Sequence, residues 1–297
     1  MSENLFIVGP GRMGLALGYA LWQTEILGSL VYCGRRPEPP SHPLFIQGHA
    51  RYVFGLERPP ADVTSVILAV PDDKLSEIAV TLSGHGEAPR GATAFHLSGA
   101  LGTDPLAPLH TQGYSVGTIH PFQTVAHPIT GADLLPGSYF AISGEPQALG
   151  AARRIVSALG SRSFTVPVSQ RPYYHVAGVF ASNYLLAVLS AAARFLDRAG
   201  IPEEDAFDAL LPLVRGTLRN LEELGARQAL TGPVARGDAE TIHLHLRMLE
   251  GRDRRLYAAL GRELLEALRP TGLDDEVSAQ LEELFERREE SEARGGA

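Results

Sequence analysis

The amino-acid sequence predicts an α/β fold in which a doubly wound parallel sheet is followed by an all-helical region. Over the first half of the chain, short apolar segments of strand length alternate with helical segments, which is typical of a parallel sheet covered by helices. From Tyr173 onward the pattern is helical, and Gly or Pro residues separate about five helices. We therefore expect an α/β domain at residues 1–168 and a helical domain at residues 169–285. Residues 286–297, charged and glycine-rich, are expected to form a flexible tail.

The first strand, expected at residues 5–8, runs directly into a glycine-rich turn that opens a helical segment at residues 15–22. A G-x-G-x-x-G turn in this context is the dinucleotide-binding fingerprint. Gly9 permits the tight turn, Gly11 lets the backbone approach a pyrophosphate, and Gly14 allows close packing of helix on strand. Free N–H groups and the helix dipole favour an anion there. The residues expected to bind the cofactor in this turn are Gly9, Pro10, Gly11, Arg12, Met13 and Gly14.

The second strand, expected at residues 30–33, ends at Gly34-Arg35-Arg36. About 20 residues after the glycines, NAD sites usually carry an Asp or Glu that accepts from the ribose 2′-hydroxyl. Two arginines stand here instead, and a planar guanidinium suits a 2′-phosphate. This predicts NADP as the cofactor; the alternative is that both arginines are solvated loop charges. Cys33, the single cysteine of the chain, is expected to be a core residue.

The later elements follow in the same alternating order. Strands are expected at residues 63–70, 93–97, 115–119, 139–142 and 164–168, and helices at residues 74–82 and 147–159. Ligands of a doubly wound sheet bind beyond the carboxyl ends of its strands. Ser98, which follows one of these strands, is therefore expected there, beside the cofactor. The loop at residues 69–72 resembles the strand-end loop that runs beside the cofactor ribose in the superfamily of 6-phosphogluconate dehydrogenase, and this resemblance implies that Val70 and Pro71 lie beside the cofactor.

This order of domains resembles the superfamily of 6-phosphogluconate dehydrogenase, the β-hydroxyacid dehydrogenases and pyrroline-5-carboxylate reductase. Three motifs, at residues 96–99, 119–123 and 230–238, resemble one bacterial family of NADP oxidoreductases with a C-terminal domain of unknown function. The resemblance implies an N-terminal Rossmann domain, NADP as cofactor and a 6-phosphogluconate-dehydrogenase-like helical domain, and it names no substrate. The dehydrogenases of the superfamily often pair a Lys with an Asn on the first long helix of the second domain. Asn183 matches the Asn, but Val179 replaces the Lys, and Lys74 is the only lysine in the chain.

Because the second domain contains no lysine that could act as a general acid, the proton donor must be another group. An imidazole suits this step, since its pKa lies near neutrality. His120, at the end of a strand, and His175, on the long helix, are both candidates, and the sequence does not decide between them. Ser182 and Asn183 would hydrogen-bond the carbonyl or imine of the substrate. Further substrate contacts are expected from His96, Gln123, Thr231 and Arg236, the last of which suits a carboxylate.

Bulk properties narrow the remaining classes. With 297 residues, 44% of them hydrophobic, the chain is long and apolar enough to form two domains with hydrophobic cores. A net charge of −8 and a pI near 5.7 argue against binding to nucleic acid or to an acidic membrane. No targeting segment, metal-ligand cluster or uninterrupted membrane span is recognised, so we expect a cytoplasmic protein. The apolar residues 176–196 predict a homodimer formed through the helical domain. Asp238 is expected to cap a helix.

Taken together, these patterns predict an NADP-dependent oxidoreductase acting on a C=O or C=N bond of a small, anionic metabolite. The alternative is a dinucleotide-binding regulator that senses the cofactor and turns nothing over. Polar side chains such as His175 and Asn183 on an otherwise apolar helix favour the enzyme, and full satisfaction of these groups by protein partners would favour the sensor.

Overall fold

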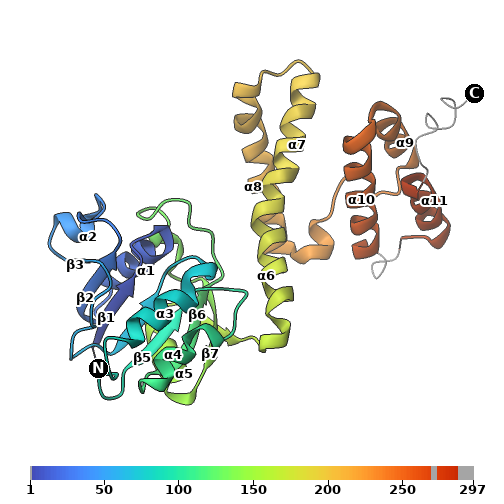
Figure 1. The fold of residues 1–297 in the computed structure, drawn as a ribbon. Helices are drawn as coiled ribbons and strands as arrows, with labels where there is room; N and C mark the ends of the chain where they lie inside the picture. The colour runs from blue at the N-terminus through green and yellow to red at the C-terminus, as the bar shows by residue number, and fades with distance from the viewer. Residues whose placement is uncertain (1, 269–272, 287–297) are drawn as a thin grey trace, which may run out of the picture. The chain divides into compact units, whose positions relative to one another are not determined.

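The computed structural model describes residues 2–268 and 273–286, and the chain divides into two compact units, residues 1–185 and 186–297 (Figure 1). Apart from Glu286, the expected tail at residues 286–297 lies outside the described residues. The first unit contains an eight-stranded sheet in the order β3-β2-β1-β4-β5-β6-β7-β8. Its strands are β1 (Glu3–Val8), β2 (Leu27–Gly34), β3 (Arg51–Phe54), β4 (Ser65–Leu68), β5 (Thr93–His96), β6 (Ser115–Pro121), β7 (Tyr139–Gly144) and β8 (Arg162–Thr165).

The six strands β1 to β6 are parallel; five of them were expected, and β3 was not. Strand β7 pairs with β6 in antiparallel orientation, and β8 pairs with β7 in parallel. The expectation of a wholly parallel sheet is therefore wrong at this edge. A parallel crossover normally requires an intervening helix. Between β6 and β7 the chain forms only the 3-10 turn Ala132–Leu134, so it re-enters the sheet in the opposite direction.

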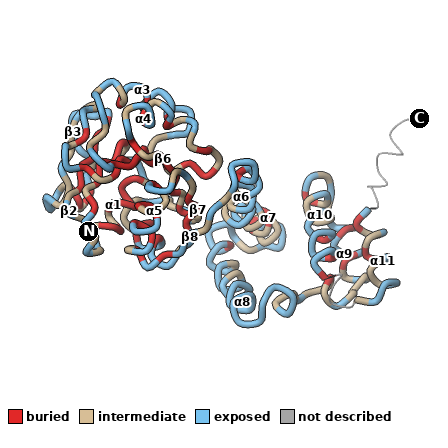
Figure 2. Tube along the Cα trace, turned by 90° about the horizontal axis from the view of Figure 1, so that it is seen from below, coloured by how far each residue is buried: buried red, intermediate tan, exposed pale blue. Residues whose placement is uncertain are grey.

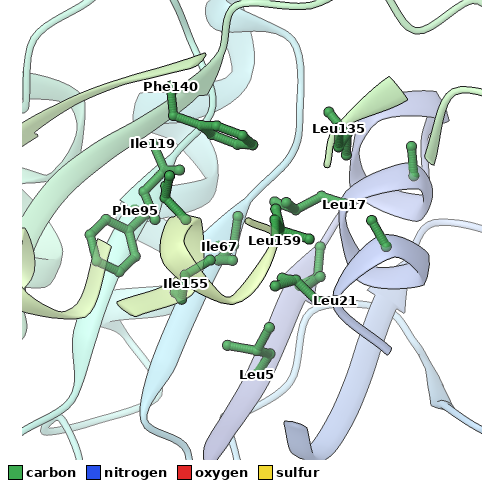
Figure 3. Close-up of a cluster of buried hydrophobic side chains, with 14 of the residues drawn as sticks. Leu5, Leu17, Leu21, Ile67, Phe95, Ile119, Leu135, Phe140, Ile155 and Leu159 are labelled. Carbon is green, nitrogen blue, oxygen red and sulfur yellow. The ribbon is translucent and has the colours of Figure 1, made fainter. Parts of the chain in front are cut away.

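Helices cover both faces of the sheet because alternate strand residues are apolar on both sides. Leu5 and Ile7 pack in one core with α1 (Arg12–Trp22) and α5 (Pro146–Ala158). Figure 3 shows Leu5 in this core with Leu21 of α1 and Ile155 of α5. Phe6 and Val8, one residue out of phase, pack in the opposite core. The helices of that second face are α3 (Leu75–Ser83) and α4 (Ala107–Thr111), and the short α2 (Pro43–Ile46) adds Leu44 to the first core.

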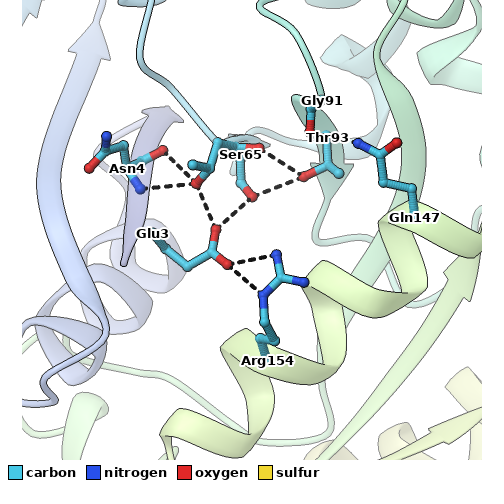
Figure 4. Close-up of polar contacts among 8 residues, drawn as sticks. Glu3, Asn4, Ser65, Gly91, Thr93, Gln147 and Arg154 are labelled. Atoms are coloured by element: carbon cyan, nitrogen blue, oxygen red, sulfur yellow. Dashed lines mark hydrogen bonds and ion pairs between the residues drawn. The ribbon is translucent and has the colours of Figure 1, made fainter. Parts of the chain in front are cut away.

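The amino end of the sheet is held by a buried carboxylate network, drawn in Figure 4. Glu3, 1% exposed, accepts from the Nε of Arg154 at 2.9 Å and from the hydroxyl of Thr64 at 2.6 Å. Arg154 also places Nη2 2.9 Å from the same carboxylate, in a two-point ion pair between β1 and α5. This network lies at the start of β1, and the glycine turn lies at its other end.

The remaining elements are helical, as expected. They are α6 (Arg171–Val179), a π-helical segment (Phe180–Tyr184), α7 (Leu185–Arg198), α8 (Glu203–Ala229), α9 (Ala239–Met248), α10 (Gly251–Leu268) and α11 (Asp275–Glu286). Helices α9, α10 and α11 share a small core that includes Ile242, Leu265 and Phe285. Asp238 caps α9 by accepting from the Thr241 N–H at 3.0 Å, which confirms its expected role.

The side chains of the long apolar helix are mostly exposed in the single chain, Val176 at 50% and Phe180 at 62% (Figure 2). The run Val168–Arg198 is also long and apolar enough to cross a membrane by length and composition, contrary to the sequence-based expectation. Core helices of soluble proteins satisfy the same criterion, so this is weak evidence for a span.

Candidate functional site

The glycine turn after β1 has the geometry that its sequence predicts. Gly9 has a φ of +103°, which favours glycine, and a Cβ there would lie 2.5 Å from the carbonyl oxygen of Ala69. A Cβ on Gly14 would lie 2.4 Å from the carbonyl oxygen of Gly9, so helix α1 can pack this closely only with glycine. The N-cap residue Gly11, by contrast, has no atom within 4 Å of its Cβ position. The open space above Gly11 fits the approach of a pyrophosphate to the backbone.

Cationic side chains gather at the edge of the sheet where this turn lies. Val8 pairs with Cys33, and the Gly9 N–H donates to the carbonyl of Cys33 at 3.0 Å, so the turn and Gly34 leave the sheet together. Arg35 and Arg36 follow directly and are exposed. Among the described residues, no carboxylate forms an ion pair with either of them. This edge can therefore bind an additional phosphate.

The backbone around these arginines is fixed by neighbouring side chains. The Tyr52 hydroxyl donates to the carbonyl of Arg36 at 2.5 Å, and the ring of Pro10 lies 3.0 Å from the Cβ position of Gly34. Arg12 at the start of α1 and the neighbouring Met13 complete the turn. Burial raises the pKa of the Cys33 thiol to about 12, which confirms an inert core residue.

At the ends of β4 and β5, hydrogen bonds within the protein occupy groups that were expected to contact ligands. Val70 lies against Gly9, with its Cγ1 3.0 Å from the Cβ position of that glycine, and the exposed Pro71 follows. The hydroxyl of Ser98 donates to Asp72 at 2.7 Å and accepts from the N–H groups of Ala100 and Leu101. Ser98 is thus a loop-forming residue, and its hydroxyl is not free for the cofactor.

His96 is also occupied within the protein. Its Nε2 donates to the carbonyl of Gly102 at 2.6 Å, its Nδ1 accepts from the Ser98 N–H at 3.1 Å, and the side chain is fully buried. This pattern fixes the neutral tautomer, and burial lowers the pKa of His96 further. The expected substrate contact through His96 is therefore wrong, since neither ring nitrogen is available.

His120 has a different environment. Its Nδ1 lies 2.5 Å from the hydroxyl of Tyr174, which α6 brings against the end of β6. Tyr174 is held by the rings of Phe122 and Phe164, with centroids 4.9 and 5.8 Å away. No described residue hydrogen-bonds Nε2 of His120, so this nitrogen is available to a bound molecule. We call these two residues the His120–Tyr174 pair.

The electrostatic surroundings keep this pair neutral near pH 7. Burial lowers the pKa of His120 to about 4, and the charges of His175 and Arg171 add to the effect, while Asp72 opposes it. Burial also raises the pKa of Tyr174 above its ordinary value. A neutral imidazole and a neutral phenol can each donate and accept, so the pair is suited to hydrogen bonding and proton transfer.

The second candidate histidine and the two polar helix residues lie on the long apolar helix. His175 and Asn183 are exposed and Ser182 is half-buried, and no described side chain hydrogen-bonds any of them. Ser182 and Asn183 lie in the π-helical segment Phe180–Tyr184. Such segments are frequent at functional sites.

The other expected substrate contacts lie in two regions. Gln123 is exposed, and its side chain bonds to the loop itself, donating to the Leu134 carbonyl at 3.3 Å. Thr231 and Arg236 belong to the second unit, and Arg236 lies 3.8 Å from Asp238. Among the described residues, no group of three or more His, Cys, Asp or Glu side chains is arranged to hold a metal ion.

Sequence reasoning missed Tyr174 and Arg171, both on the first turns of α6. The only signal for Tyr174 was its position beside His175, and an aromatic residue next to an apolar helix is ordinarily assigned to a core. No signal in the sequence points to Arg171, because arginine side chains are usually exposed.

The comparisons with known proteins agree with this architecture. Residues 50–121 match a Rossmann-like domain, and residues 138–264 match the family described as domain of unknown function DUF2520. The two matches follow each other in the order expected from the sequence, a Rossmann-like region followed by a region similar to DUF2520, which confirms the expected resemblance. A comparison with curated proteins finds no match.

Solved structures share the fold over nearly the whole chain. The "putative NADP oxidoreductase BF3122" of Bacteroides fragilis is 26% identical with a TM-score of 0.67, covering 89% of this chain and 98% of its own. The protein TM1727 of Thermotoga maritima is 22% identical with a TM-score of 0.69, covering 90% and 99%. The pyrroline carboxylate reductase of Plasmodium falciparum, crystallised with NADP bound, is 13% identical with a TM-score of 0.58 and 96% coverage of both chains.

Proposed function

We propose that the protein is an NADP-dependent oxidoreductase that transfers a hydride to or from a C=O or C=N bond of a small, anionic metabolite. The observation that carries this proposal is the glycine turn, which leaves open space over Gly11 beside the unpaired Arg35 and Arg36. The names of similar structures support it, since BF3122 is described as a "putative NADP oxidoreductase". The pyrroline carboxylate reductase of Plasmodium falciparum was crystallised with NADP, and a reductive aminase of Aspergillus terreus was crystallised with NADPH.

The residues of the turn fit such a cofactor. Gly9, Gly11 and the first N–H groups of α1 would hold the pyrophosphate, and Arg35 with Arg36 would hold the 2′-phosphate. When bound, the nicotinamide supplies the hydride or accepts it, and the protein has to orient the substrate and handle the proton.

The His120–Tyr174 pair is the group best suited to the proton. At neutral pH His120 is an uncharged imidazole, so its first role is to hydrogen-bond the carbonyl or imine through Nε2 and so polarise it. The Tyr174 hydroxyl, 2.5 Å from Nδ1, holds the imidazole ring in place by a hydrogen bond on the side opposite Nε2. This observation favours His120 over the exposed His175 as the proton-handling residue. Asn183, Ser182, Gln123, Thr231 and Arg236 remain proposed substrate contacts.

The activity is tested by following NADPH oxidation at 340 nm with a panel of 2-oxo acids and cyclic imino acids. We expect turnover of at least one of them, and a loss in kcat of about 100-fold or more in His120→Asn and Tyr174→Phe. His175→Asn is the matched control and should retain most of the activity. Tight NADPH binding without turnover of any compound would instead favour the cofactor-sensing alternative.

We also propose that the protein is a cytoplasmic homodimer that covers its exposed apolar helices. The exposed large side chains of these helices include Val176, Phe180, Tyr184, Leu186, Leu213 and Leu224. An exposed apolar surface of this kind marks an interface. Light scattering of protein purified without detergent should give twice the chain mass. A monomer at micromolar concentration contradicts the dimer, and a requirement for detergent would favour the membrane reading of Val168–Arg198.

A further inference from the structure

Arg171 is the largest of the fully buried side chains, with none of its surface exposed. It is the first residue of α6, and its guanidinium reaches three other elements. Its Nη1 donates to the carbonyls of Ser98 and Gly99, at 3.3 and 3.5 Å. Its Nη2 donates to the hydroxyls of Thr118 at 2.5 Å and Ser143 at 2.8 Å. The contacts therefore join α6 to the loop after β5 and to strands β6 and β7.

All these acceptors are neutral. Within residues 2–268 and 273–286, no carboxylate forms an ion pair with Arg171, and its Nε has no hydrogen-bond partner. A buried cation without a counter-charge is costly, and an apolar side chain of similar size would serve packing better. A structural role alone does not explain why a charge is kept at this position.

The position of Arg171 relative to the site gives a reason. Tyr174 lies three residues further along α6, so it stands about one helical turn from the anchored Arg171. Its hydroxyl contacts His120. Thr118, which accepts from Arg171, lies two residues before His120 on β6. The same side chain therefore fixes both elements that carry the His120–Tyr174 pair.

We propose that Arg171 is a positioning residue for the proton-handling pair, holding Tyr174 against His120. After burial and the charge of His175, the same guanidinium also lowers the pKa of His120. This proposal rests on the proposed function of the pair. The charged or titratable groups that act on His120 are His175 and Arg171 on α6, Asp72 after β4 and His96 on β5, with Tyr174 as its hydrogen-bond partner. Of these, Arg171 is the permanent cation.

The test is an NMR titration of the His120 ring in the full-length protein, with the signal assigned by its absence in His120→Asn. In Arg171→Met we expect the pKa of His120 to rise by about one unit, because the neighbouring cation is lost. Arg171→Lys keeps the charge and should keep this pKa low. The exposed Arg153, on α5, provides the matched control Arg153→Met, which should leave the titration unchanged.

A second variant keeps the test decisive if Arg171→Met does not fold. Thr118→Val with Ser143→Ala removes both hydroxyl partners of Nη2 and leaves the charge. We expect this variant to bind NADPH like the wild type while its kcat with the best compound of the panel falls about tenfold. An unchanged His120 titration in Arg171→Met, or unchanged turnover in the double variant, overturns the proposal. The titration needs neither cofactor nor substrate, so failure of NADPH binding in the wild type would refute the proposed function separately.

Discussion

Acidification should destabilise the protein through His120, because folding holds this imidazole in an environment that disfavours its charged form. The pKa of His120 lies at about 4 in the fold, against 6.5 for an ordinary histidine, and burial is the main cause. The unfolded chain therefore binds a proton more readily than the native state does. The contribution of neutral His120 to the free energy of unfolding is therefore fully present above pH 6.5, and it is lost as the pH falls from 6.5 towards 4.

The size of the effect follows from these two pKa values. At pH 4.5 an unfolded-state histidine is almost fully protonated while His120 in the fold is mostly neutral, which corresponds to about 2–3 kcal/mol of lost stability. His96, also buried with a lowered pKa, contributes in the same direction. A comparison with His120→Asn is therefore needed to isolate the contribution of His120, because Asn does not titrate.

The assay is urea unfolding of the wild type and of His120→Asn at pH 7.5 and pH 4.5, followed by circular dichroism. The wild type should lose more free energy of unfolding between the two pH values than the variant does, by about 2 kcal/mol. Equal losses in the two proteins would show that His120 titrates normally in the fold. That result would refute the assignment of a neutral, buried imidazole at this site.

Three further predictions concern single contacts. A Cβ on Gly99 would lie 2.7 Å from Nε2 of His120. Gly99→Ala should therefore lower the free energy of unfolding by about 1–3 kcal/mol and remove most of the activity. The control Gly150→Ala, at a helical glycine without close contacts, should lower neither. Glu3→Gln removes the charge that Arg154 contacts at 2.9 Å and should lower the free energy of urea unfolding by about 1–3 kcal/mol without affecting NADPH binding; an unchanged value would contradict the network. Asp238→Ala removes the cap of α9 and should lower the free energy of unfolding by about 1 kcal/mol in the same assay, and no loss would contradict the cap.

The sheet was predictable because its local pattern and its packing agree. Strands β1 and β4 are buried on both faces, so they appear in the sequence as short continuous apolar runs that end in turn residues. The glycine turn was equally clear, since Gly9 and Gly14 meet backbone and side-chain atoms that exclude any Cβ. The reversal of β7 was not predictable from these patterns. The reversal follows because the connection at residues 122–138 contains no crossover helix.

The site was less predictable because its chemistry depends on contacts between distant segments. His96 and His120 both stand at strand ends, yet one bonds to Gly102 six residues away and the other to Tyr174, 54 residues away. Only the tertiary structure shows which imidazole keeps a free nitrogen. For the apolar helix, composition predicts that its surface is covered but does not say whether the same chain or a second copy covers it.

The measurement that tests the central claim most directly is calorimetric binding of NADPH and NADH to the wild type and to Arg35→Ala/Arg36→Ala. We predict that the wild type binds NADPH at least tenfold more tightly than NADH, and that the double variant loses this preference while still binding NADH. Gly11→Ala, whose new Cβ meets no protein atom, should fold normally and weaken the binding of both cofactors. Failure of the wild type to bind either cofactor would contradict the proposal of an NADP-dependent oxidoreductase.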